Sequence, residues 1–448
     1  MMDTLPQMER KPTTAFFPSE GEPAHGPAWL QSLRKKARAR LSDLEFPTTD
    51  HEEWRFTNVG PLAQWPLKAP DASARQATPA EVAPHRLVGG GFCLVFVDGR
   101  FRTELSTMPG SGAGFRAGNL GSLSDSDGAE VEKNLARHVP ADANYFTALN
   151  TARFEDGAFV FVTANAAITE PVQLLYIATG AQPGAAVHVR NLIVAEQASS
   201  IKIIESYVSL AVTPSFTNTV TELVLAADAR VEHCRLQNEN EQTFHVSWVQ
   251  AEQARNSHWL SHSIATGGRV ARNQIQTRLN AEGAEAILNG LYLARGEQLI
   301  DHHTVVDHAQ PRCESHEFYF GILAGRAHGV FNGKIFVRQD AQKTNAKQTN
   351  RNMVLSENAL INTKPQLEIF ADDVKCTHGA TVGQLNEEAL FYLRARGIGA
   401  DLARRMLVRA FANDAVERIT LAPVRAYLDQ LLTERFEGLD TSLSSHGR

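Results

Sequence analysis

Short runs of β-forming residues recur through the middle of the chain, and their spacing constrains the fold more than any other feature. From Ala158 onward, runs such as AFVFV, VQLLYIA and RVEHCRLQ are separated by small and polar residues. A repeated phrase, an acidic or polar residue followed by alanine and an alternating strand, places alanines at positions 198, 229, 254 and 284, which are 31, 25 and 30 residues apart. Periods of this size are typical of solenoids.

The segments between these runs indicate which kind of solenoid forms. They contain no helical stretch long enough to cross over between strands as in a βαβ unit. The sequence therefore predicts a mainly β fold whose core, residues 158–383, is a parallel β-helix. A β-sandwich or an antiparallel barrel is the alternative, because strands of 4 to 8 residues have the same local pattern in all three architectures.

Three further regions flank this core. Residues 1–28 are rich in Pro, Gly and polar residues and are expected to be flexible, as is the end of the tail, TSLSSHGR. Residues 29–157 form a mixed N-terminal region that begins with a basic helical pattern, WLQSLRKKARARL. Residues 384–440 are predicted to be helical, with Asn386 as an N-cap and Gly397 closing the first helix.

Composition excludes several classes of protein. The 448 residues are 43% hydrophobic and 21% charged, with a net charge of -6, which does not suggest binding to nucleic acid or to an anionic membrane. No apolar run approaches 18 residues and no signal peptide is recognisable, so a cytoplasmic protein is expected. The four cysteines are scattered without a CxxC motif, which argues against a disulfide framework or a self-contained zinc site.

Two motifs invite a chemical interpretation without strongly supporting one. DHHTVVDH, residues 301–308, is the densest histidine cluster, and Asp301 and His303 would share a strand face. A metal site there competes with an ordinary polar face of a solenoid. GVFNGKI, residues 329–335, lacks the spacing of a phosphate-binding loop and is expected to form a strand-turn-strand corner at Asn332 and Gly333.

A third motif, DDVKCTHGATVG at residues 372–383, offers the best candidate ligands. Cys376 and His378 stand two residues apart in a strand-like run, so their side chains share a face and could bind one metal. Each residue also has a purely structural interpretation. A free cysteine can act as a small buried hydrophobe, and a histidine at the end of a strand can be held by ordinary hydrogen bonds.

The motifs from Asp301 onward together carry a family resemblance. DHHTVVDH, FNGKIFV, DAQKTNAKQTNRNMVLSENALINTKPQLEIFADDVKCTHGATVG and EEALFYLRARGI resemble the SufB/SufD family of iron-sulfur cluster assembly scaffolds. The resemblance extends upstream through NYFTALNTARFEDG to EEWRFTN. SufB-like chains tend to have an acidic residue after the histidine of this motif, whereas Gly379 resembles the SufD-like sister.

The resemblance implies a right-handed parallel β-helix between an N-terminal helical region and a C-terminal helical domain that binds a SufC-like ABC-type ATPase. It implies a non-enzymatic SufD-like subunit that binds no nucleotide and shares a transient iron-sulfur cluster with a SufB-like sister. His378 takes the family's role at the cluster site, and Cys376 matches by position. A SufB-like scaffold and a β-solenoid metal-dependent enzyme using residues 301–308 are the alternatives, and a homodimer stays open.

Overall fold

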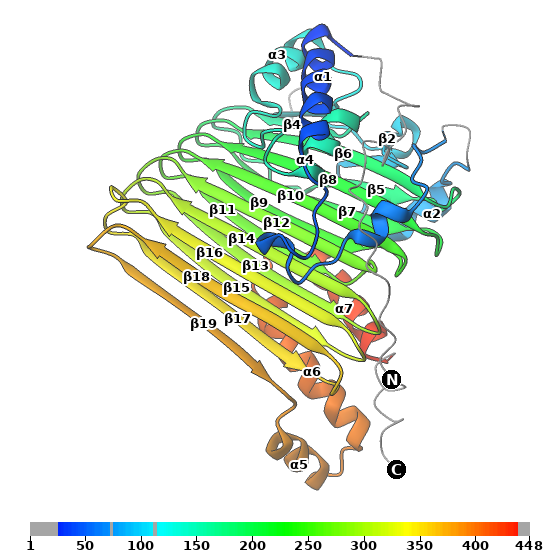
Figure 1. Cartoon of the computed structure of the whole chain (residues 1–448), viewed down its shortest axis with the longest axis vertical. Coiled ribbons are helices and arrows are strands. Elements are labelled where there is room, and N and C mark those ends of the chain that lie inside the picture. The colour runs from blue at the N-terminus through cyan, green and yellow to red at the C-terminus, as the bar shows by residue number, and fades with distance from the viewer. Residues whose placement is uncertain (1–25, 72–74, 111–113, 438–448) are drawn as a thin grey trace.

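The computed structural model describes residues 26–71, 75–110 and 114–437. Most of the N-terminal segment predicted to be flexible, and all of TSLSSHGR, lie outside these ranges. Two sheets face each other along the molecule, and each coil of the chain adds one strand to each sheet (Figure 1). The pairs run from β4 with β5 to β18 with β19, eight coils in all. The predicted parallel β-solenoid is confirmed.

Within each sheet, nearly all neighbouring strands are parallel. The ten-stranded sheet has the order β19 (Lys375–Gly383), β17 (Asn345–Val354), β15 (Glu314–Leu323), β13 (Glu285–Ala294), β11 (His258–Ala265), β9 (Arg230–Asn238), β7 (Ser200–Ser209), β5 (Val172–Ala178), β1 (Cys93–Val97) and β2 (Arg100–Phe101). The nine-stranded sheet has the order β18 (Leu360–Ile369), β16 (His328–Val337), β14 (Leu299–His308), β12 (Val270–Leu279), β10 (Thr243–Gln253), β8 (Ser215–Leu225), β6 (Ala185–Ala195), β4 (Ala158–Val162) and β3 (Phe115–Asn119).

The repeat seen in the sequence corresponds to one corner of each coil. At this corner a residue adopts a positive φ, which lets the chain turn sharply from one sheet to the other. The corner residues, 27 to 33 positions apart, are Asn165, Ala198, Asp228, Asn256, Gly283, Arg312 and Lys343. The alanines lie at or within two residues of these corners, and Ala229 and Ala284 are fully buried beside them. The spacing of the alanines is uneven because each alanine lies at a slightly different position relative to its corner residue.

The first coil is closed by elements from the N-terminal region. Strand β1 pairs in parallel with β5, so the solenoid recruits a strand from before residue 158. Strands β2 and β3 then pair antiparallel with β1 and β4 at this end. The helices of this region are α1 (Ala28–Asp43), α2 (Pro79–Val82), α3 (Asp125–Asn134) and α4 (Tyr145–Arg153), with 3₁₀ turns at Glu52–Trp54, Gly60–Gln64, Ala83–His85 and Thr103–Leu105.

A buried ion pair fastens the N-terminal region to the outer face of the nine-stranded sheet. Arg190 lies 2.8 Å from Glu222, and both side chains are fully buried. Glu222 also accepts hydrogen bonds from the backbone N–H groups of Ala136, His138 and Val139. These donors satisfy a carboxylate that would otherwise be costly to bury.

Three C-terminal helices follow the last strand: α5 (Glu387–Ala395), α6 (Ala400–Val416) and α7 (Ala422–Glu437). As predicted, Asn386 caps α5 by accepting a hydrogen bond from the Ala389 N–H, and Gly397 follows with φ of 86°. Helices α6 and α7 bury an apolar stripe, including Val408 and Leu428, against the outer face of the ten-stranded sheet. None of the helices that the structure describes is long and apolar enough to span a membrane.

One local prediction is wrong. Residues 328–337 form a single continuous strand, β16, so Asn332 and Gly333 do not make a turn. Asn-Gly is a strong turn signal in isolation. Here both neighbours, β14 and β18, pair in register across these two residues, and the parallel ladder holds them extended.

Candidate functional site

The last coil, formed by β18 and β19, is the open end of the solenoid. Each strand pairs with the preceding strand of its own sheet, β16 or β17, and no other described strand pairs with its outer edge (Figure 1). The apolar side chains of this coil are consequently half-exposed or exposed, and Leu360, Phe370 and Val382 each leave more than half of their surface accessible. Such an uncovered sheet end is a ready-made surface for another chain.

Strand β19 places Cys376 and His378 on the inward face of this open end. Cys376 is in register with Ala346, and His378 is in register with Gln348, both of which are buried in the solenoid interior. Side chains in register on parallel strands point to the same side of the sheet. The two candidate ligands therefore share a face, as the sequence predicts, and no further coil covers them.

The two side chains differ in exposure. Cys376 is partly buried against Ile335, Val337 and Ala346, and burial raises the pKa of its thiol. His378 is exposed, and adding a Cβ at the following residue, Gly379, would meet no neighbouring atom. The end of the solenoid thus presents one candidate sulfur ligand, which is partly buried, and one candidate imidazole ligand, which is exposed.

The remaining cysteines cannot complete a metal site from within the chain. Cys93, Cys234 and Cys313 are buried on other coils. Burial raises the pKa of Cys93 to about 11 and also raises the pKa of Cys234 and Cys313, which disfavours the thiolate that binds metal. Across the described parts of the chain, no group of three or more His, Cys, Asp or Glu side chains is arranged to hold a metal ion.

The histidines of residues 301–308 are divided between the two faces of β14. His302 and His308 point inward, and burial lowers the pKa of His302 to about 3 and that of His308 to about 4. His303 points outward, 3.1 Å from Asp301 and 3.3 Å from Glu53. The alternation that makes a strand separates the cluster, so these histidines do not converge on one site.

The outward pair instead anchors the segment EEWRFTN on the nine-stranded sheet. Asp301 accepts hydrogen bonds from Thr57 and from Arg272, each at 2.5 Å. The Arg272 guanidinium lies 4.1 Å from the centre of the Trp54 ring, a cation–π contact. Asp301 is fully buried, and these partners hold its pKa below the ordinary range although burial works to raise it. The cluster has a structural role.

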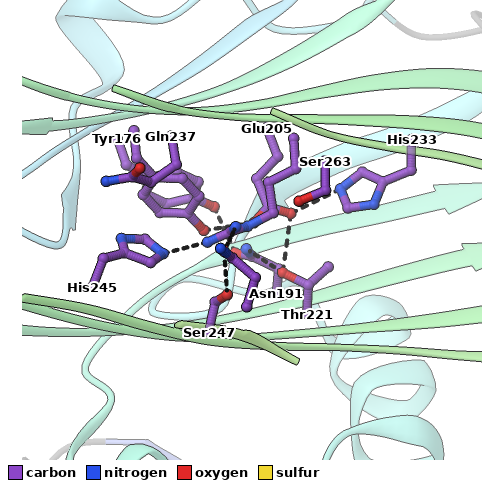
Figure 2. Close-up of polar contacts among 12 residues, drawn as sticks. Tyr176, Asn191, Glu205, Thr221, His233, Gln237, His245, Ser247 and Ser263 are labelled. Carbon is purple, nitrogen blue, oxygen red and sulfur yellow. Dashed lines mark hydrogen bonds and ion pairs between the residues drawn. The ribbon is translucent and has the colours of Figure 1, made fainter. Parts of the chain in front are cut away.

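A buried polar network lies between the sheets in the middle coils and was missed by sequence reasoning (Figure 2). Glu205 lies 3.0 Å from His233 and 3.4 Å from Arg235, and Arg235 hydrogen-bonds to Asn273 and His245. In the sequence, these residues resemble the solvated positions of half-buried strands. The sequence did carry one signal of this network: polar residues recur at alternate positions in successive strand-like runs, such as ESY and EHCRLQ.

Comparisons with known proteins identify the family of this chain. A family model described as "SUF system FeS cluster assembly, SufBD core domain" matches residues 176–411, more than half of the chain. This chain belongs to the SufBD family. A second model, "SufBD protein N-terminal region", matches residues 23–174. The family resemblance seen in the sequence is confirmed, and iron-sulfur cluster assembly is the activity to which this SufBD protein is linked.

Relatives of this SufBD protein include three from bacteria. It is 32% identical to an iron-sulfur cluster assembly SufBD family protein of Synechocystis, with 91% of each chain covered. It is 31% identical to the iron-sulfur cluster assembly protein SufD of Escherichia coli, covering 90% of this chain and 91% of the relative. Identity to SufD of Bacillus subtilis is 28%, covering 94% and 97%.

Proposed function

We propose that this chain is a SufD-like subunit of a SUF scaffold complex, where it supports de novo cluster assembly at an interface with a SufB-like sister. The observation that carries the proposal is the open last coil, with Cys376 and His378 on its inward face and two strand edges with which no further described strand pairs. A docked subunit would cover the exposed apolar side chains of β18 and β19. It would also bring the further ligands that the described residues of this chain do not assemble.

Cys376 and His378 are suitable ligands for an iron-sulfur cluster that is shared with another subunit and passed on. Iron-sulfur clusters are held mainly by thiolates, with imidazole as an occasional substitute. His378 contributes an accessible imidazole to the proposed interface, and Cys376 lies on the same strand face with a partly buried thiol whose pKa is raised by burial. In this proposal the cluster is held transiently and shared, and the sister supplies most of the thiolates.

A SufC-like ATPase is proposed to dock on α5 and the start of α6. This part of the chain exposes four large apolar side chains, among which Phe391 is 73% exposed. They are Phe391, Tyr392, Leu402 and Met406. The stretch most like a phosphate loop is the interior of strand β16, so the ATPase subunit supplies nucleotide binding and hydrolysis in this arrangement.

The decisive experiment is His378→Ala in the co-expressed three-subunit complex. His378 is exposed, so its loss should change the free energy of unfolding by no more than about 0.5 kcal/mol and leave the complex intact. Iron and acid-labile sulfide recovered with the complex should fall to the level of a sample lacking the sister. Normal cluster content in His378→Ala would refute the proposed role of this histidine.

ATPase docking has its own test. Truncation after Gly397 would remove α6 and α7 from the ten-stranded sheet and expose its apolar outer face, so surface substitutions are the cleaner choice. The double variant Phe391→Ser with Met406→Ser should lose the ATPase on co-purification. The control is Val212→Ser, which removes a 70% exposed apolar side chain far from the helices in sequence and should retain it.

The alternative SufB-like role makes a different prediction. A chain that holds a cluster by itself would retain iron and sulfide after reconstitution without partners. We expect the isolated chain to retain neither, because the structure brings together only one sulfur and one imidazole ligand at the open end.

A further inference from the structure

Three inward residues of the ten-stranded sheet form a column that ends at His378. Strand pairing puts Glu317 of β15 in register with Gln348 of β17, and Gln348 in register with His378 of β19. Glu317 and Gln348 are buried, whereas His378 occupies the uncovered end. Neighbouring strands lie about 4.8 Å apart, a distance that a glutamine side chain can span.

The contacts beneath His378 fix the orientation of the Gln348 amide. Glu317 Oε2 accepts a hydrogen bond of 2.6 Å from the hydroxyl of Thr304 and one of 3.3 Å from Gln348 Nε2. Because Oε2 already accepts from Thr304, it acts as an acceptor whether or not Oε1 carries a proton, and an acceptor oxygen attracts the NH₂ end of the amide and repels its oxygen. The nitrogen of Gln348 is therefore committed to Glu317, and Oε1 is left as the available acceptor.

The facing sheet makes room for this glutamine. The column opposite consists of Thr304, Gly333 and Pro365, which are in register on β14, β16 and β18. A Cβ added to Gly333 would overlap the Gln348 amide, with Cδ only 2.7 Å away. Gly333 thus leaves a cradle that the glutamine side chain fills. Pro365, the next in that column, offers no polar partner to the imidazole.

Two buried acceptors in this column have no hydrogen-bond partner among the described residues: Glu317 Oε1 and Gln348 Oε1. An unpaired buried acceptor is unfavourable, and such atoms often mark a functional contact. The nearest in-register residue that carries an N–H donor on its side chain is His378, because the imidazole ring always has at least one. The amide oxygen of Gln348 is an acceptor without a donor, and the imidazole of His378 carries a donor that it could use.

We propose that Gln348 is a positioning residue for His378. Its amide oxygen accepts a hydrogen bond from one ring N–H of the imidazole, and Glu317 holds the amide in the orientation that makes this possible. The hydrogen bond fixes the ring tautomer and leaves the other nitrogen free for the cluster, which is how ligating histidines are generally held. The proposal rests on the proposed function in assigning His378 as a ligand.

The direct test is the tautomer of His378, read from imidazole ¹⁵N shifts in the full chain and assigned by difference from His378→Ala. The native chain should show one dominant tautomer. Gln348→Met keeps the length of the side chain but removes the acceptor, so the two tautomers should become mixed. The matched control is Gln253→Met, the same substitution at a buried glutamine on β10, which should leave the His378 signal unchanged.

Cluster content gives a second readout. Loss of a residue that orients a metal ligand typically weakens metal binding by 10-fold to 100-fold. Iron recovered with the Gln348→Met complex should fall several-fold relative to Gln253→Met. Should Gln348→Met not fold, Glu317→Gln, which preserves volume but frees the Gln348 amide to flip, should also mix the tautomers.

An unchanged tautomer in the Gln348 or Glu317 variant would overturn the proposal. This outcome is distinguishable from failure of the proposed function, because the tautomer is measured without a cluster. If His378→Ala assembles clusters normally while Gln348→Met mixes the tautomers, the hydrogen bond is real and the ligand assignment is wrong.

Discussion

Two glutamates buried in the same solenoid differ in how completely their charge is compensated. In the middle coils, one oxygen of Glu205 accepts a 2.6 Å hydrogen bond from Tyr207. The other accepts one of 3.0 Å from Thr221 and lies 3.0 Å from His233 (Figure 2). Burial works to raise the pKa of Glu205, but His233 and Arg235 outweigh it and lower the pKa to about 2. This carboxylate is fully partnered and ionised.

Near the open end, Glu317 has the opposite character. One of its oxygens is held by Thr304 and Gln348, both neutral, and the other has no partner among the described residues. Burial therefore dominates and raises the pKa to about 7. The two carboxylates therefore differ in the charge of their partners: a histidine and an arginine face Glu205, whereas only neutral groups hydrogen-bond to Glu317.

The largest effect is expected from Glu205→Leu, which would remove the carboxylate at the centre of the network around Arg235. The substitution leaves Arg235 buried without its carboxylate, and removing one partner of a buried ion pair costs about 3–5 kcal/mol. Urea unfolding measures this loss. The control, Glu297→Leu, removes an exposed carboxylate paired with Arg326 and should cost no more than about 0.5 kcal/mol. Equal midpoints for the two variants would show that the network contributes nothing to stability.

The second test sharpens the contrast through pH. The pKa of Glu317 is about 7 in the folded chain, against 4.5 for an ordinary glutamate. Between these two pH values the folded chain therefore keeps a proton on Glu317. Unfolded chains release that proton first, so this residue makes the native protein less stable with rising pH, by about 1.4 kcal/mol per unit across the window.

Glu317→Gln should remove this dependence. The stability of the variant relative to the native chain should increase between pH 5 and pH 7 and then level off, as measured by urea unfolding at intervals of one pH unit. Glu297→Gln, at an exposed position, should follow the native curve. A difference that stays constant across the window would mean that Glu317 is already ionised in the folded protein.

The smallest effect is expected from Cys376→Ala at the open end itself. The thiol is only partly buried, so replacing it with a methyl group should cost about 1 kcal/mol or less. Cluster recovery with the complex should remain well above that of His378→Ala, since the sister supplies thiolates in the proposed arrangement. If Cys376→Ala abolishes clusters while the melting temperature is unchanged, the thiol is an essential ligand.

Much of the architecture could be predicted because its signals are local. The corner residues and the alternating runs specify strands and their period, and Asn386 and Gly397 mark the ends of α5. That Cys376 and His378 share one face follows from the two-residue period of a strand alone. The turn expected at Asn332 and Gly333 failed because register with β14 and β18 overrides the local preference of that dipeptide.

The local pattern of residues was enough to predict that strands repeat and that the two candidate ligands, Cys376 and His378, share a strand face. Which face of each strand is interior depends instead on packing between elements that are distant in the chain. On β9, Cys234 and Leu236 point outward beneath α6 and α7, while His233 and Arg235 point inward to Glu205. Side chains alternate between the two faces with the same period whichever face is covered, so the pattern does not reveal the interior face. The helices that cover the outer face of β9 lie more than 150 residues away in the chain. The open end likewise exists only because no coil follows β19 in the described structure.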